Sequence, residues 1–166
     1  ENVAKLKLPA LYRNHEGPKD EKLAKLKSYL AILGIDFKAT KPKPADFQAV
    51  LQSIKDRPDA PIIETMLLRS MKQAVYSPEN LGHFGLAYEA YGHFTSPIRR
   101  YPDLLIHRAV GALIDEHLVE KFAYSEDDMN RLGKHCSSTE RRADEATREV
   151  VAWLKCEYMQ DKLGQV

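Results

Sequence analysis

The chain has 166 residues, of which 43% are hydrophobic and 30% are charged, and its net charge is +1. This length and hydrophobic content suffice for one domain with a sizeable core, and nothing in the composition indicates a second domain. A charge this close to neutral gives no argument about nucleic acid. Neither an apolar run as long as a membrane span nor a signal-peptide pattern is present, so we expect no membrane contact and a cytoplasmic location. Cys136 and Cys156 lack metal-ligand spacing and are expected to be reduced, partly buried thiols.

The first half of the chain predicts an interrupted extended segment followed by three helices. Leucines at helical spacing predict a helix over residues 20–34, with Asp20 as its cap and Gly34 as its stop. A second helix is expected to begin at Pro44, and a third to cover residues 60–77. The apolar faces of these helices comprise Leu23, Leu26, Leu30, Leu33, Phe47, Val50, Leu51, Ile54, Ile63, Met66, Leu67, Met71 and Ala74.

The second half predicts a strand and then two helices. Residues 83–94 alternate in character, which is typical of a strand with two different faces. A helix is expected over residues 103–118, and Ser125 is expected to cap a long last helix. The predicted buried stripes of these two helices comprise Ile106, Val110, Leu113, Ile114, Leu118, Met129, Leu132, Ala143, Ala146, Val150, Trp153 and Leu154. The fold class is therefore mainly α (α+β), with one or two short strands within residues 75–94.

The stretch HFTSPIRRYPD contains two prolines around a pair of arginines. Pro97 suits a first helical position behind Ser96 as a cap. Pro102 would clash with the preceding turn of a helix that began there, so a short turn followed by a second helix start is predicted. This turn, which we call the arginine elbow, carries Arg99 and Arg100. Backbone N–H groups at helix starts and guanidinium groups can converge on an anion there.

Other candidates for chemistry are weaker. Asp127 and Asp128 are adjacent carboxylates, but a position at a helix start explains both without a metal. No glycine-rich phosphate loop is present. Six histidines show no ligand spacing: His15, His83, His93, His107, His117 and His135. We therefore predict no metal site within this chain.

The segment HFGLAYEAYGHFTSPIRRYPDLLIHR closely resembles the signature of the ribonuclease II/ribonuclease R family, whose catalytic domain is called RNB. KLPALYRNHEGP, RPDAPIIETMLLRSMKQAVYSPEN and ERRADEATREVVAWLKCEYM are also similar to this family, so the resemblance covers essentially the whole chain. It implies the largely helical C-terminal half of an RNB domain. It also implies processive, magnesium-dependent hydrolysis of RNA from its 3′ end, releasing nucleoside 5′-monophosphates.

The resemblance also implies roles for residues of the elbow. In this family an arginine of the SPIRR motif contacts the scissile phosphate, which makes Arg99 the first candidate and Arg100 the second. A structural salt bridge stays equally open for Arg100. Asp103 and His107 lie four residues apart on one helix face and are expected to orient the elbow. RNA contacts or support of the elbow are expected from Tyr91, His93, Thr95 and Ser96.

The chain also departs from the family pattern. The aspartate cluster that holds magnesium in the upstream half of an RNB domain has no counterpart here, and neither do the flanking oligonucleotide-binding barrels. We therefore expect residues 1–166 to be part of a longer RNA-degrading enzyme, inactive alone, with the Mg²⁺ ligands elsewhere. The alternative is a non-catalytic helical module that binds RNA or a protein. A half-domain is further expected to expose an apolar surface through which it can self-associate.

Overall fold

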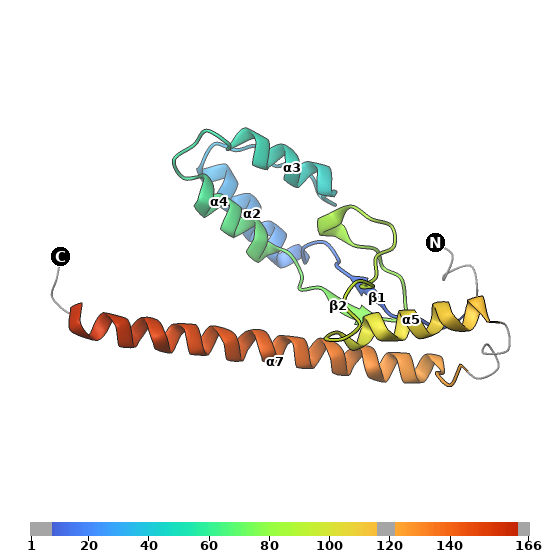
Figure 1. The fold of residues 1–166 in the computed structure, drawn as a ribbon. Helices are drawn as coiled ribbons and strands as arrows, with labels where there is room; N and C mark the ends of the chain where they lie inside the picture. The colour runs from blue at the N-terminus through green and yellow to red at the C-terminus, as the bar shows by residue number, and fades with distance from the viewer. Residues whose placement is uncertain (1–7, 116–121, 163–166) are drawn as a thin grey trace.

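The computed structural model describes residues 8–115 and 122–162, and this part of the chain is mainly helical, as predicted (Figure 1). Two three-residue strands form one small sheet. The helices and strands are β1 Tyr12–Asn14, α2 Asp20–Ile32, α3 Pro44–Ser53, α4 Ala60–Ser70, β2 Val75–Ser77, η1 Phe84–Leu86, α5 Tyr101–Ile114, α7 Glu126–Met159 and η2 Gln160–Lys162. None of the helices in the described part is long and apolar enough to cross a membrane.

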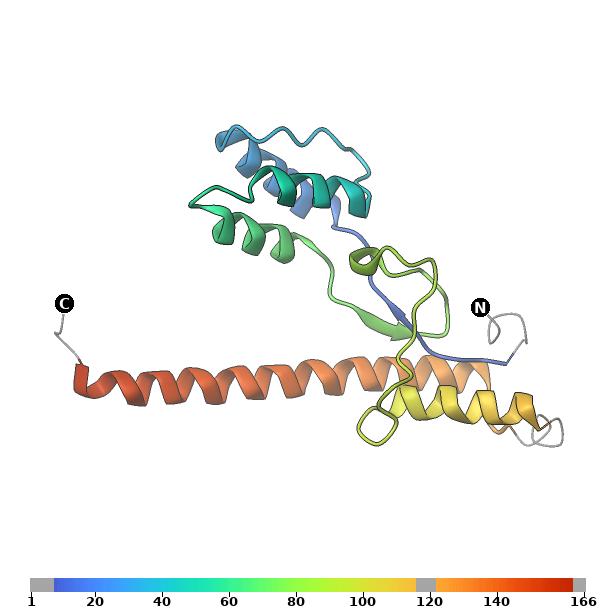
Figure 2. The same cartoon turned by 45° about the horizontal axis from the view of Figure 1, so that its top comes forward.

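The helices α2, α3 and α4 pack together as a helical lobe set apart from the strands (Figures 1 and 2). Gly34 ends α2 in the left-handed region at φ +72°, as its predicted role requires. Pro44 occupies the first position of α3, also as predicted. Asp20 does not cap α2, because Lys19 holds that position and Asp20 is the first helical residue. The core of the lobe comprises Leu26, Leu30, Phe47, Val50, Ile54, Ala60, Ile63 and Leu67.

The third helix is shorter than predicted. It ends at Ser70 because Met71 is extended, and the residues that follow pair with β1 instead. The two strands are antiparallel, with Arg13 opposite Tyr76. Apolar content alone does not distinguish a helix end from a buried strand, which is why the boundary was misplaced.

The prediction of a strand over residues 83–94 is wrong. Between β2 and α5 the chain forms η1 and a series of turns, with only isolated bridges at His83. Gly82 at φ +73° and Ala87 at φ +56° both adopt left-handed backbone, which interrupts any extended segment. The alternating character does not correspond to two faces, because residues 86–90 are all exposed.

The buried face of α5 is rotated from the predicted one. Leu105, Ala109 and Ala112 are buried, whereas Ile114 is 81% exposed. Ile106, Val110 and Leu113 are half-buried, and Leu118 lies outside the described residues. Asp103 lies on this buried side of the helix, together with Leu105, Ala109 and Ala112.

The long helix α7 packs against the strands with its first half only. Ser125 caps it as predicted, accepting a hydrogen bond from the Asp128 N–H at 3.1 Å. Gly133 lies so close to β2 that an added Cβ would be 2.7 Å from the Tyr76 carbonyl oxygen. A second small core forms there from Leu11, Tyr76, Leu105 and Met129.

Every residue of α7 from 141 to 159 is exposed. The predicted buried stripe continues along this half, but Val150, Trp153 and Leu154 are 57%, 63% and 49% exposed. Figure 1 shows this end of α7 running on beyond the strands. Cys156 is likewise exposed rather than partly buried, whereas Cys136 is half-buried. Exposed apolar side chains therefore lie along the C-terminal half of α7.

Candidate functional site

The arginine elbow is a tight turn that leads into α5. The Ser96 carbonyl accepts hydrogen bonds from the backbone N–H groups of Arg99 and Arg100 at 3.3 and 3.0 Å. Helix α5 begins at Tyr101, so Pro102 lies in its first turn, where a missing N–H leaves no bond unmade. The predicted turn and second start are confirmed. No helix begins at Pro97, and Ser96 organises the turn through its backbone rather than through its hydroxyl.

Arg100 is held by a buried carboxylate. Asp103 is 0% exposed, and its Oδ2 accepts hydrogen bonds from Arg100 Nη2 and from the Ser96 N–H, each at 2.8 Å. Thr95 Oγ1 lies 3.5 Å from the same Arg100 nitrogen. Arg100 Nε and Asp103 Oδ1 are buried without a partner in the part of the chain described. A structural salt bridge was one of the two alternatives for Arg100, and it is present. It holds the Arg100 side chain in place.

Arg99 has a different environment. Its side chain is exposed, and no hydrogen bond or ion pair of its guanidinium is seen among the described residues. It lines an open cavity of about 680 Å³ between the elbow, the start of α5 and α7. The other lining residues are Tyr76, Arg100, Tyr101, Pro102, Leu132, His135, Cys136, Thr139, Glu140, Ala143 and Asp144. The elbow thus presents one anchored arginine and one free arginine to the same cavity.

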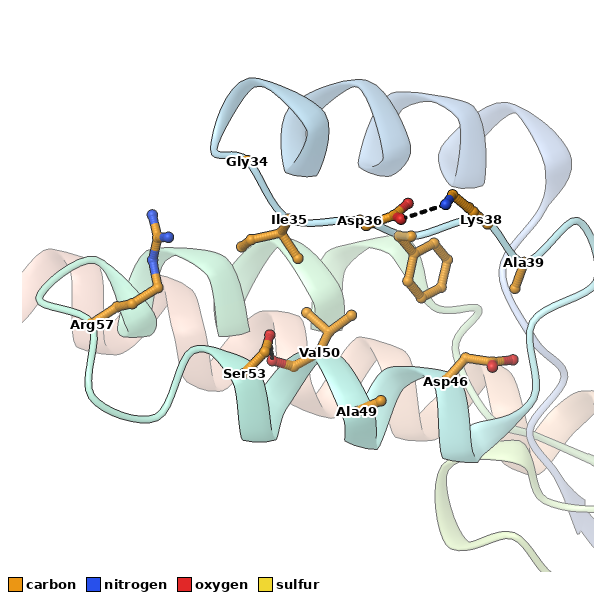
Figure 3. Close-up of a pocket in the computed structure, with 11 residues that line it drawn as sticks. Gly34, Ile35, Asp36, Lys38, Ala39, Asp46, Ala49, Val50, Ser53 and Arg57 are labelled. Carbon is orange, nitrogen blue, oxygen red and sulfur yellow. Dashed lines mark hydrogen bonds and ion pairs between the residues drawn. The ribbon is translucent and has the colours of Figure 1, made fainter.

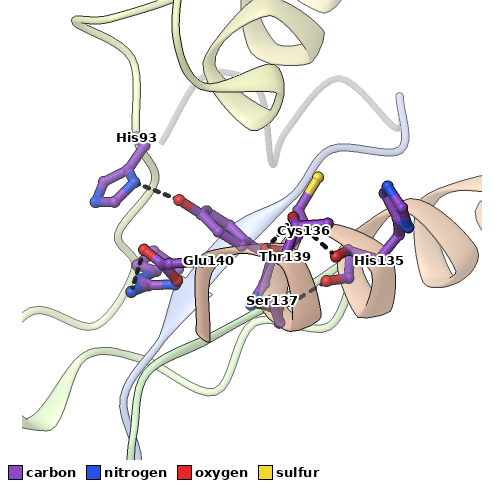
Figure 4. Close-up of polar contacts among 9 residues, drawn as sticks. His93, His135, Cys136, Ser137, Thr139 and Glu140 are labelled. Carbon is purple, nitrogen blue, oxygen red and sulfur yellow. Dashed lines mark hydrogen bonds and ion pairs between the residues drawn. The ribbon is translucent and has the colours of Figure 1, made fainter. Parts of the chain in front are cut away.

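A polar network connects this cavity to the strands (Figure 4). Arg13 donates two hydrogen bonds to the Glu140 carboxylate, at 2.6 and 3.0 Å. Its guanidinium carbon lies 4.6 Å from the centroid of the Tyr76 ring. Burial raises the pKa of Tyr76 to about 12, so its hydroxyl keeps its proton, and it forms a hydrogen bond with His93 Nδ1 at 2.8 Å. Sequence reasoning missed Arg13, Tyr76 and Glu140, since 127 positions separate Arg13 from Glu140.

The remaining candidates brace the loop that precedes the elbow. Tyr91 places its ring edge-to-face against His93, with centroids 5.7 Å apart. Burial, with the Arg100 and Arg13 charges adding to it, lowers the pKa of His93 below its usual value. His107 Nε2 donates to the Phe94 carbonyl at 2.8 Å, and their rings stack at 4.2 Å. His107 therefore holds the loop ahead of the elbow and does not contact the elbow arginines.

The described residues do not fit a magnesium site. Among them, no three His, Cys, Asp or Glu side chains come together in a way that could hold a metal ion. Asp128 belongs to the cap of α7, where hydrogen bonds from Ser125, together with the Arg131 charge, lower its pKa. Asp127 beside it is exposed.

A second open cavity of about 450 Å³ lies in the helical lobe (Figure 3). It lies between the segment that follows α2 and one side of α3, with Arg57 at one end. Arg57 is paired with Asp59 at 2.8 Å, and Asp36 is paired with Lys38 at 2.8 Å. These charges are satisfied locally, so this cavity has no unpaired group comparable to Arg99.

Comparison with known proteins identifies the family. The sequence matches the RNB domain family over residues 1–116, more than half of the chain. The chain belongs to the RNB domain family. This RNB chain is 51% identical to Ribonuclease R of Escherichia coli (strain K12), in an alignment covering 99% of the chain and 21% of that relative. It therefore spans about a fifth of the length of that relative. The resemblance noted from the sequence is confirmed.

Solved structures agree with the RNB assignment. The apo form of Mycoplasma genitalium RNase R matches with a TM-score of 0.91 at 27% identity, over 99% of this chain and 26% of that one. The same protein in complex with ribose methylated single-stranded RNA matches with a TM-score of 0.84, at 27% identity over the same shares. Yeast Ssd1, a pseudonuclease, matches with a TM-score of 0.65 at 26% identity, over 81% of this chain and 17% of that one.

Proposed function

We propose that this chain forms one wall of the active site in a 3′-to-5′ exoribonuclease that hydrolyses RNA to nucleoside 5′-monophosphates. RNA as the partner is supported by the Mycoplasma genitalium relative, whose structure contains single-stranded RNA. The proposal includes magnesium ions whose ligands come from parts of a longer protein outside this chain. The role proposed for the elbow does not depend on those ions.

The observation that carries this proposal is the contrast between the two elbow arginines. Arg100 is committed to Asp103 through a charged hydrogen bond, whereas Arg99 is exposed on an open cavity. A guanidinium cannot lose its proton at neutral pH and offers two parallel donors to a phosphoryl group. Arg99 is thus suited to stabilise charge that develops on a scissile phosphate, with Arg100 and Asp103 holding the turn that positions it.

Replacement of Arg99 by lysine tests this role in the longer protein that contains the chain. The charge is kept but the paired donors are lost, so the single-turnover rate constant should fall about tenfold. The dissociation constant for RNA should change by less than about twofold, because the contact strengthens in the transition state.

Arg108→Lys is the matched control, since Arg108 on α5 donates to the Tyr124 hydroxyl and does not line the cavity. It should leave the rate unchanged. Equal losses in affinity and rate for Arg99→Lys would indicate uniform binding, and an unchanged rate would remove Arg99 from the active site.

The 166-residue chain by itself should release no mononucleotides from RNA when Mg²⁺ is supplied. The reason is that its described residues form no group able to hold the metal. Chromatography of the reaction products measures this directly. Mononucleotide release that survives repurification and disappears with Arg99→Ala would overturn the expectation.

Binding of RNA without hydrolysis is the second candidate function. The likeness to yeast Ssd1 favours this second function, because Ssd1 has a similar fold and is described as a pseudonuclease. A longer protein that binds RNA tightly yet releases no mononucleotides would support this alternative. Self-association through the exposed half of α7 remains a further prediction.

A further inference from the structure

Five aromatic rings form a continuous row beside the arginine elbow. Neighbouring ring centroids lie 4.9, 5.0, 5.7 and 5.6 Å apart, each pair edge-to-face. In order, the rings are His15, His83, Tyr91, His93 and Tyr76. Tyr76 lines the cavity of the elbow, and His15 and His83 line another open cavity of about 900 Å³. The row therefore connects two cavities on the surface.

All three imidazoles of the row use Nδ1 for a hydrogen bond within the chain. His15 Nδ1 accepts from the Gly85 N–H at 3.0 Å and His83 Nδ1 accepts from the Leu86 N–H at 3.2 Å, whereas His93 Nδ1 shares a hydrogen bond of 2.8 Å with the Tyr76 hydroxyl. A ring nitrogen that accepts carries no proton, so the proton of a neutral His15 or His83 ring lies on Nε2, and His93 has the same tautomer when the Tyr76 hydroxyl donates. Burial also lowers the pKa of His83 and of His93, which favours the neutral ring.

The Nε2 atoms of the three imidazoles are free to bind a ligand. None of them has a hydrogen-bond partner among the residues described, and none is among the buried unpaired atoms there, which are Arg100 Nε and Asp103 Oδ1. They therefore reach the surface. Figure 4 shows His93 with its second ring nitrogen turned away from Tyr76.

Three carboxylates near the row are paired with cations, which weakens their repulsion of a ligand rich in oxygen acceptors. Near His93, Glu140 is paired with Arg13, and Asp103 is paired with Arg100. At the other end, Glu16 is paired with Lys72 at 2.6 Å. Lys43, Asn80 and Glu89 also line the cavity of His15 and His83. Tyr88 beside them is 58% exposed and offers a ring face for stacking.

We propose that His15, His83, Tyr91 and His93 form a binding surface for single-stranded RNA, whose phosphate and ribose oxygens accept hydrogen bonds from the three neutral imidazoles. This inference rests on the proposed function, because the row ends at the cavity that holds Arg99. Tyr76 is a positioning residue, which orients His93 through its hydroxyl. A row of neutral donors binds a strand without the salt dependence that lysine contacts bring.

Asparagine and glutamine substitutions separate the two nitrogens of each ring. Asparagine places an oxygen near the Nδ1 position and so keeps the structural acceptor, whereas glutamine places an N–H near the Nε2 position and keeps the outward donor. Affinity for a short fluorescein-labelled oligouridylate is measured by anisotropy on the longer protein, without divalent cations. His83→Asn and His93→Asn should each weaken binding about 3- to 10-fold, as expected for one lost hydrogen bond. His83→Gln and His93→Gln should stay within about twofold of wild type.

The reverse order, with glutamine weak and asparagine normal, would show that these histidines only brace the loop, and it would overturn the inference. A His93→Asn effect that fades as pH rises from about 6 to 8 would also overturn it, because it would reveal a cationic imidazole. Tyr29→Phe, which removes a hydroxyl in the helical lobe, should leave binding unchanged.

Failure of this inference is distinguishable from failure of the proposed function. The longer protein could hydrolyse RNA in a way that depends on Arg99 while its asparagine variants bind RNA normally. That result would refute the proposed binding surface and leave the proposed function in place. A longer protein that binds no RNA would overturn both.

Discussion

Replacing Asp103 by alanine is expected to lower the free energy of unfolding by about 3 kcal/mol, the lower end for breaking a buried ion pair. The carboxylate is fully buried and accepts hydrogen bonds from both Arg100 and the Ser96 N–H. Its loss leaves a backbone N–H and a guanidinium without their acceptor. The Arg100 side chain is 23% exposed, so its guanidinium can recover part of its hydration, which limits the loss. Urea denaturation followed by circular dichroism measures the change, because the single tryptophan, Trp153, is too exposed to report on packing.

Asp56→Ala provides the control for this experiment. Asp56 is exposed beyond the end of α3, and its loss should change stability by less than about 0.5 kcal/mol. Asp103→Asn should lie between the two, since it keeps an oxygen acceptor but removes the charge. Wild-type stability in Asp103→Ala would mean that the elbow is held by contacts other than this pair.

Replacing Gly133 by alanine is expected to destabilise the chain by about 2 kcal/mol, within the range for overpacking a core. The added Cβ would lie 2.7 Å from the Tyr76 carbonyl oxygen, 3.2 Å from its carbon and 3.2 Å from Leu11 Cδ2. A backbone carbonyl cannot rotate away, so α7 and β2 must separate. Their separation would also move the Ser137 hydroxyl from the Tyr76 N–H, which it now meets at 2.8 Å.

Gly111→Ala is the matched control, because Gly111 is also helical but nothing lies within 4 Å of its added Cβ. Alanine is the better helix former there, so this variant should gain about 0.5–1 kcal/mol. The same urea titration compares both. Opposite signs for the two glycines are the expected result, and a stabilised Gly133→Ala would contradict the close approach of α7 to β2.

The helical lobe shows how much local pattern can predict. Leu23, Leu26 and Leu30 are buried as their spacing predicted, because an amphipathic helix must bury its apolar stripe. Leu51 was predicted to be buried and is exposed, since a spacing rule does not fix how wide the covered stripe is. The same limit applies to α7. Its apolar stripe continues through residues 141–159, although all of these residues are exposed.

The elbow was predictable because proline chemistry is local. Pro102 cannot continue a helix begun five residues earlier, and this alone separated the turn from α5. A structural salt bridge was one of two open alternatives for Arg100, and the structure identifies Asp103, three residues further along at the start of α5, as its partner. That Arg99 rather than Arg100 stays unpaired depended on which side chain met the buried carboxylate.

The mainly helical class, the family, and the elbow with its two arginines were predictable from the sequence, because each rests on residues adjacent in the chain or on helical spacing. Three features became known only from the folded chain: the rotation of α5, the close contact at Gly133, and the network that joins Arg13, Tyr76, His93 and Glu140. These depend on distances between segments that are remote in sequence, and no periodicity records such distances. Polar side chains of that kind acquire their partners, tautomers and pKa values only when packing brings them together.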